Sequence, residues 1–262
     1  MRRVSAALIS GVSTIALTQV TSAADLPQKA PAYTPPPSIY SWTGFYIGGH
    51  VGYSWGSVDT DTARIGPPNP PFLATPLIFS FGRDLNPTGG LAGVQAGYNF
   101  QVARVVYGVE ADLSWTGQRD SFNFASTRFD PTTAEDFSYQ ETLSAKLRYM
   151  GTVRGRIGYA FGEFLPYVTG GFAWGRMTVD LNSTLRQSPT PVTASFSGSD
   201  AHTLFGWTLG AGFEYAFAEH WSAKAEYLFV DLGEKTYFAG IPGSGSFGMQ
   251  DHIVRIGVNF RP

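Results

Sequence analysis

The sequence predicts an all-β protein, in which eight antiparallel strands close into a barrel that crosses a membrane. Three observations support this prediction. Apolar and polar residues alternate along eight segments, the connections between these segments are alternately long and short, and the 262 residues include 31 glycines, 15% aromatic residues and only 15% charged residues. Strict alternation gives a strand one apolar and one polar face, which suits a barrel wall between lipid and a polar interior.

The segment 105–115 has the clearest strand pattern. Its sequence, VVYGVEADLSW, places Val109 and Leu113 on one face and Glu110 and Asp112 on the other. A helix would spread the two acidic residues around its apolar side, so the alternation favours a strand.

Three further segments complete the first half of the predicted barrel. Segment 45–55 alternates aromatic and aliphatic residues with glycine, histidine and serine, and segment 90–102 alternates alanine, valine and aromatic residues with glycine, glutamine and asparagine. Segment 144–159 sets Leu147 and Tyr149 against a polar face. That face carries four basic residues, namely Lys146, Arg148, Arg154 and Arg156.

Segment 165–179 is the fifth predicted strand and has the least regular pattern. Tyr167 and Phe172 both suit the apolar face, although their positions differ in parity. An extra residue in one strand shifts the alternation, so we expect a bulge near Gly170-Gly171.

The last three predicted strands are 203–217, 221–232 and 252–260. In the first of these the apolar face is mostly aromatic and faces a glycine-rich side. The other two alternate alanine, aromatic and β-branched residues with polar ones. The polar faces of the three segments carry Glu214, Lys224, Glu226 and Arg255.

The connections differ in length according to the end of the barrel on which they lie. The long connections are 57–88, 116–142, 180–202 and 233–251, and the short ones are 101–104, 160–164 and 218–220. Long extracellular loops, short periplasmic turns and an even strand number are typical of outer-membrane barrels with both termini in the periplasm.

Alternation alone does not determine which face points inward, and a soluble lipocalin-like barrel is the alternative. An eight-stranded interior has little spare room, and most Trp, Tyr and Phe residues share the apolar face, whereas glycines crowd the other. The apolar face is therefore predicted to face lipid, and the polar face to line a narrow, charge-filled lumen. The predicted network comprises Glu110, Asp112, Lys146, Arg148, Arg154, Arg156, Glu214, Lys224, Glu226 and Arg255.

Residues 1–23 are predicted to be a secretory signal peptide, because Arg2 and Arg3 precede an apolar stretch that ends in small residues. A permanent anchor is the alternative. The proline-rich residues 24–42 are predicted to form a periplasmic linker, with a PxxP ligand as the alternative, and 43–262 the barrel domain. Without the leader, 16 basic residues face 20 acidic ones, and a net charge of −4 does not suit nucleic-acid binding.

No catalytic, metal or cofactor site is expected. The chain has no cysteine, and its four histidines lack the spacing of metal ligands. Outer-membrane deacylases need a histidine beside a serine on the lipid-facing surface. His252 has the outward parity, but no serine accompanies it on that face. Omptin-like proteases need a barrel with more strands.

Several segments resemble the small outer-membrane β-barrel proteins of alphaproteobacteria, the opacity-like or "porin family" surface antigens. They are ADLP, SWTGFYIGGHVGYSWG (41–56), VVYGVEADLSW, the hairpin at 153–175 and WSAKAEYLFVDLG (221–233). The resemblance implies a Gram-negative outer-membrane location, a structural envelope or interaction role, and no catalytic residues. It also implies contact with outer-membrane lipids, lipopolysaccharide and the barrel-assembly machinery. A small-solute porin is the alternative function.

The C-terminus departs from this family pattern. Members usually end on an aromatic residue that the assembly machinery recognises, whereas this chain ends Asn259-Phe260-Arg261-Pro262. Phe260 shares the outward parity of Val258, so it is predicted to be a displaced assembly signal.

Overall fold

A computed structural model describes residues 40–61, 63–65, 79–81, 85–131, 134–189, 191–238 and 245–262. The predicted signal peptide and residues 24–39 of the predicted linker lie outside the described residues. Within these ranges, no helix has the length and apolar character needed to cross a membrane.

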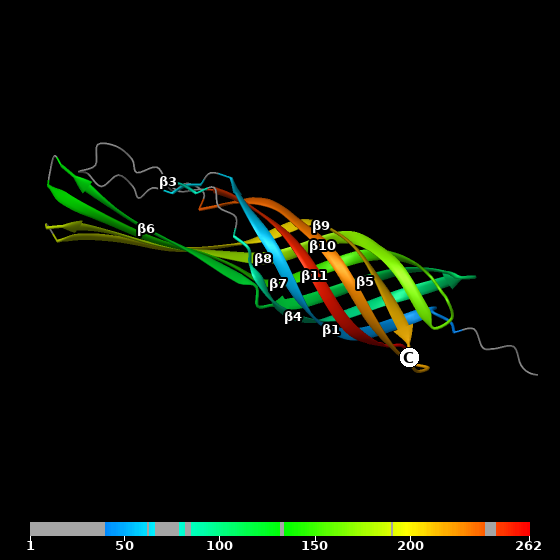
Figure 1. The fold of residues 1–262 in the computed structure, drawn as a ribbon. Helices are drawn as coiled ribbons and strands as arrows, with labels where there is room; N and C mark the ends of the chain where they lie inside the picture. Colours follow the sequence, from blue (N-terminus) through cyan, green and yellow to red (C-terminus); the bar gives the residue numbers. More distant parts are fainter. Residues whose placement is uncertain are drawn as a thin grey trace, which may run out of the picture. The chain divides into compact units, whose positions relative to one another are not determined.

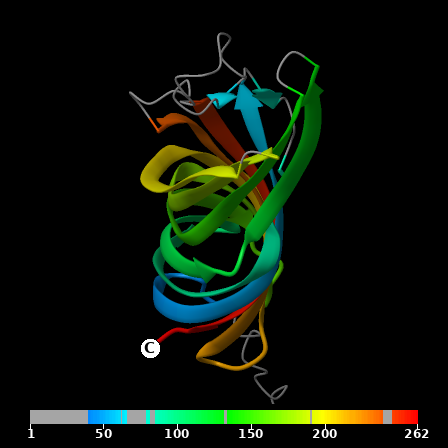
Figure 2. The same cartoon turned by 90° about the vertical axis from the view of Figure 1, so that its left-hand side faces the viewer.

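Eleven strands make up the described structure. They are β1 (Gly44–Asp61), β2 (Ala63–Ile65), β3 (Phe79–Phe81), β4 (Thr88–Val102), β5 (Val105–Thr116), β6 (Arg119–Asp130), β7 (Glu135–Tyr159), β8 (Phe164–Ser188), β9 (Val192–Ala216), β10 (Trp221–Tyr237) and β11 (Gly245–Phe260). Eight of them pair in the order β1-β11-β10-β9-β8-β7-β5-β4, and β4 pairs back to β1, so the ring is closed. All neighbours are antiparallel, and the strands wind around a common axis (Figure 2). The predicted eight-stranded antiparallel barrel is confirmed.

At the end with the long loops, the ring strands β7, β8 and β9 continue past the ring, and β6 joins them. Residues 135–146 of β7 pair with β6 and with the end of β8, which in turn pairs with the start of β9. Figure 1 shows this four-stranded sheet extension projecting from the barrel. The prediction that 116–142 and 180–202 are loops is therefore wrong over most of their length. These segments look polar because one face of the extension meets solvent, yet their backbone groups are paired in ladders.

The outward face of the barrel is apolar, as predicted. Aliphatic side chains such as Val109 and Leu209 are 61% and 59% exposed. Exposed aromatic residues form a belt at each end, for example Tyr107 near the short turns and Trp115 near the long loops. Two aromatic belts around an aliphatic band match the two interfaces of a bilayer.

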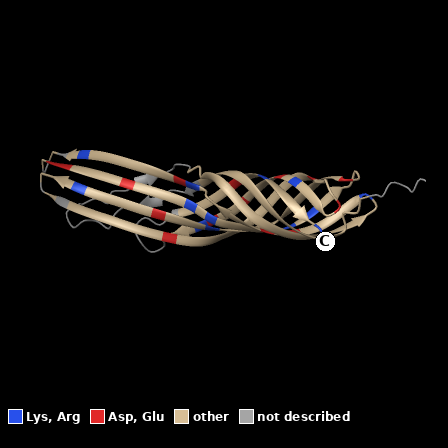
Figure 3. Cartoon of the chain, turned by 90° about the horizontal axis from the view of Figure 1, so that it is seen from below, with Lys and Arg blue, Asp and Glu red and all other residues tan. Residues whose placement is uncertain are grey.

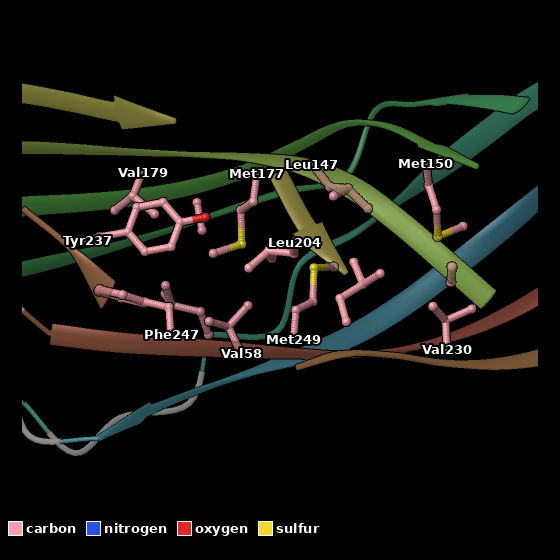
Figure 4. Close-up of a cluster of buried hydrophobic side chains, with 14 of the residues drawn as sticks. Val58, Leu147, Met150, Met177, Val179, Leu204, Val230, Tyr237, Phe247 and Met249 are labelled. Carbon is pink, nitrogen blue, oxygen red and sulfur yellow. The ribbon is translucent and has the colours of Figure 1, made fainter. Parts of the chain in front are cut away.

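The interior of the barrel has three layers. Trp42 packs with four apolar residues at the end with the short turns, namely Val106, Ala160, Leu165 and Ala216. Charged and polar side chains fill the middle. A hydrophobic cluster fills the end with the long loops, and Met150, Met177 and Met249 all lie in it (Figure 4).

The N-terminal boundary of the barrel differs from the prediction. Trp42, placed in the linker by the sequence, is fully buried, and its indole Nε1 donates a hydrogen bond to the Gly162 carbonyl oxygen at 2.9 Å. The stretch before β1 therefore closes the barrel mouth, because a large apolar ring there removes water from the end of the lumen.

The predicted bulge near Gly170-Gly171 is wrong. The register of β8 against both neighbours is continuous there, and Tyr167 simply points inward with the alternation of its strand. The irregularity lies on β7 instead, between Leu147 and Tyr149.

Candidate functional site

The predicted charge network lies in the middle layer of the lumen, with two of its ten members missing. Eight side chains are at most 5% exposed and come from β5, β7, β9, β10 and β11: Glu110, Asp112, Arg154, Arg156, Glu214, Lys224, Glu226 and Arg255. They lie between the two apolar layers of the interior.

Lys146 and Arg148 do not belong to the network, contrary to the prediction. Both are exposed, and Lys146 pairs with Asp180 at 2.8 Å on the outside of the sheet. The cause is the extra residue on β7, which reverses the alternation, so that Leu147 points inward and the two bases point outward.

Glu110 is the hub of the network. One of its oxygens lies 2.5 Å from Arg154 Nη2 and 2.8 Å from Lys224 Nζ, and the other accepts a hydrogen bond from the Tyr46 hydroxyl at 2.8 Å. Glu110 and Arg154 are direct partners in the β5–β7 register, as the sequence predicted for neighbouring strands. Lys224 reaches Glu110 from across the lumen.

Arg154 and Arg255 share the carboxylates of Asp112 and Glu226. Asp112 lies 3.1 Å from both arginines, and Glu226 lies 3.0 Å from Arg154 and 2.7 Å from Arg255. The Thr152 hydroxyl also donates to Asp112 at 2.5 Å. Both guanidinium groups therefore bridge Asp112 and Glu226, which joins β5, β7, β10 and β11 across the lumen.

Glu214 and Arg156 form the part of the network closest to the short turns. Their side chains lie 2.8 Å apart, and Ser222 and Asn259 donate hydrogen bonds to the other Glu214 oxygen. Glu214 faces Lys224 in the β9–β10 register, but its ion pair is with Arg156 of β7. Register alone therefore does not identify the partner of a long side chain.

The network is balanced in charge. Four carboxylates face four cations, because the loss of Lys146 and Arg148 removes the excess of two bases that the sequence suggested. Buried charges are tolerated when each is paired and its remaining hydrogen-bonding atoms are satisfied. Balanced charge allows this without a bound ion.

Several polar partners were not identified from the sequence. Tyr46 and Tyr167 line the lumen, and their rings lie 5.1 Å and 4.8 Å from the Arg156 guanidinium carbon. His50 Nδ1 lies 2.9 Å from Gln95 Oε1, and its Nε2 lies 2.8 Å from Ser114 Oγ. The alternation of each strand contains this signal, since Tyr46 shares the inward parity of His50 and Tyr167 shares that of Leu165.

The remaining candidates lie outside the lumen. Phe260 packs against Trp221 with ring centroids 5.1 Å apart, within the aromatic belt near the short turns. His252 faces outward, where Tyr227 places its hydroxyl 2.7 Å from His252 Nδ1 and Trp55 stacks on the imidazole. Among the described residues, no group of three or more His, Asp or Glu side chains is arranged to hold a metal ion.

A closed ring of eight strands with a lipid-compatible exterior and a polar, packed interior defines a transmembrane β-barrel. Residues 16–261 match the family described as "Outer membrane protein beta-barrel domain". The chain therefore belongs to the outer-membrane β-barrel family, and its location is the cell outer membrane. The end with the long loops is extracellular, and the end with the short turns is periplasmic.

The chain is similar to two relatives and, more distantly, to one solved structure. The chain is 31% identical to the 31 kDa outer-membrane immunogenic protein of Brucella melitensis biotype 1, over 98% of this chain and 97% of the relative. It is 28% identical to the 22 kDa outer membrane protein of Rhizobium leguminosarum bv. viciae, over 84% and 78%. The outer membrane protein OprG of Pseudomonas aeruginosa is similar with a TM-score of 0.41 and 12% identity, over 84% and 97%. The prediction of a small alphaproteobacterial-type outer-membrane barrel is confirmed.

Proposed function

We propose that this protein is a non-enzymatic outer-membrane surface protein with a structural or interaction role, and that its barrel does not conduct solutes. The observation that carries the proposal is the balanced charge network, in which eight buried charged side chains pair with one another across the lumen. Charged groups engaged in this way are unavailable for catalysis, and they occupy the space that a water column would need.

The apolar layer above the network supports the same proposal. Met177, Leu204 and Met249 are at most 1% exposed and come from three different strands, so apolar side chains fill much of the extracellular half of the lumen, together with the buried pair Gln118 and Asp251. A solute would have to cross this layer as well as the ion pairs. Eight strands enclose an interior just wide enough for side chains, which disfavours the small-solute porin.

The extension of β6, β7, β8 and β9 favours a role at the cell surface. The paired strands of the extension project beyond the outer leaflet (Figure 1). This part of the protein is therefore accessible to an interaction partner or an antibody. Brucella relatives are named as immunogenic proteins, which fits an exposed surface of this kind. The extension emerges from outer-membrane lipids and lipopolysaccharide, and we propose that these molecules are its binding partners.

Single-channel recording on refolded protein in a planar bilayer tests the closed lumen. We expect no steady conductance on the scale of a general porin. Arg154→Ala removes the guanidinium that bridges three acids and should produce small, fluctuating currents. Lys146→Ala, on the outer surface, is the matched control and should leave the trace unchanged. A large, steady wild-type conductance would establish the porin instead.

A further inference from the structure

The bulge on β7 exposes basic residues at one place on the outer surface. Arg148 is the extra residue and is exposed, Lys146 is exposed on the same face, and Arg119 of β6 is the direct register partner of Lys146. Arg176 of β8 is the register partner of Tyr149 and alternates with the inward-facing Met177. We name these four residues, Arg119, Lys146, Arg148 and Arg176, the basic patch. Lys and Arg gather where the extended strands leave the barrel (Figure 3).

The basic patch lies next to the extracellular aromatic belt. Trp115 pairs with Tyr149 in the β5–β7 register, and Trp174 lies two residues before Arg176 on β8. Tryptophan and tyrosine mark the level at which headgroups begin, and a residue advances at most about 3.4 Å along a strand. The basic patch is therefore at headgroup height on the outer leaflet.

The protein neutralises only part of the charge of the basic patch. Lys146 forms an ion pair with Asp180, whose pKa is held below its usual range by hydrogen bonds from Lys146 and Ser199. Among the residues that the structure describes, Arg119, Arg148 and Arg176 have no ion pair. Arg119 and Lys146 even face each other directly, and opposed like charges destabilise a sheet. A bound anion would remove this repulsion.

We propose that the basic patch binds the phosphate groups of an anionic lipid in the outer leaflet. Arginine presents paired donors that match a phosphate, and the belt beside it accepts the adjoining apolar part of the lipid. The lipid source is favoured over a dissolved anion because the basic patch stands at the height where headgroup phosphates are fixed and concentrated. This inference depends on the position of the barrel in the membrane, and a conducting lumen would not affect it.

The test uses full-length barrel refolded into phosphatidylcholine vesicles that contain a minor fraction of lipid A. Native mass spectrometry of barrel released from these vesicles measures how much lipid A stays bound. We expect wild type to retain lipid A in preference to phosphatidylcholine. Arg119→Gln with Arg148→Gln should lower that retention roughly 25-fold, or about fivefold per charge. Both positions are exposed, and the shift in gel mobility on heating checks that the variant is folded.

Two arms distinguish the outcomes. Arg128→Gln with Arg186→Gln removes two exposed arginines farther along β6 and β8, and it should leave lipid A retention unchanged. An equal loss of lipid A retention in this control would show that only the total charge of the protein matters, and it would overturn the proposal that the basic patch is a binding site. Inorganic phosphate and chloride at equal ionic strength should reduce retention equally. Selective displacement by phosphate would identify a site for a free anion and overturn the lipid assignment, as would unchanged retention in the first variant.

Discussion

Glu110 shows how one residue organises the lumen. Its carboxylate contacts Arg154, Lys224 and the Tyr46 hydroxyl, and it is 3% exposed. A single carboxylate that neutralises two cations from opposite walls couples strands that share no ladder. The network therefore contributes to the stability of the ring as well as to the filling of the lumen.

Glu110→Gln should destabilise the barrel by about 3–5 kcal/mol, because it leaves buried cations without their counter-charge. The free energy of unfolding, measured by urea titration of the barrel in vesicles, checks this value. Lys146→Ala is the control, since its ion pair with Asp180 is exposed and should contribute at most about 1 kcal/mol. Equal effects of the two variants would contradict the buried network.

Arg148 changes the orientation of neighbouring side chains on β7. As the extra residue on β7 it reverses the alternation, so that Leu147 joins the apolar layer and Lys146 leaves the lumen. The same residue thus balances the charge of the network and creates the basic patch. Odd and even positions identify the two faces of a strand only where its pairing has no bulge. An assignment based on alternation therefore fails beyond such a residue.

At the scale of the element, the C-terminal strand β11 ends at Phe260, and Arg261, which follows it, has different surroundings. Phe260 lies in the periplasmic aromatic belt beside Trp221. Arg261 is 8% exposed, its guanidinium carbon lies 5.0 Å from the Trp42 ring, and its Nη1 donates to the Tyr40 hydroxyl at 2.9 Å. The last residues therefore hold the apolar layer that closes the periplasmic mouth.

These surroundings predict separate effects on assembly and on stability. Phe260→Ala should lower insertion into the outer membrane more than deletion of Arg261 and Pro262, if the displaced aromatic residue is the assembly signal. Arg261→Ala should leave insertion intact but lower the stability of the barrel by about 1–2 kcal/mol, through the lost contact with Trp42. Fractionation of cell envelopes measures the first effect, and urea unfolding the second. The assignment fails if the deletion blocks insertion as strongly as Phe260→Ala.

At the scale of the whole molecule, closure of the ring determines how the barrel resists denaturation. Every ladder in the wall is paired, because β4 returns to β1 and leaves no free edge within the ring. Detergent alone should not unfold such a wall, whereas boiling in detergent should. We expect the folded and boiled forms to migrate differently on a gel. Identical migration of a sample with intact β-structure by circular dichroism would contradict the closed barrel.

The sequence by itself determined the number of strands in the ring, the outward direction of the apolar face and most of the lumen charges. Alternation is a local property, and residues such as Val109 and Glu110 report their faces without reference to any neighbour. Only the tertiary structure decided the bulge at Arg148, the exit of Lys146 from the lumen and the extension of β6 to β9. Each of these depends on how a strand is paired. The tertiary structure also decided the ion-pair partners of Glu214 and Lys224. Long side chains reach across the lumen, so neither sequence separation nor strand register identifies the charges that they contact.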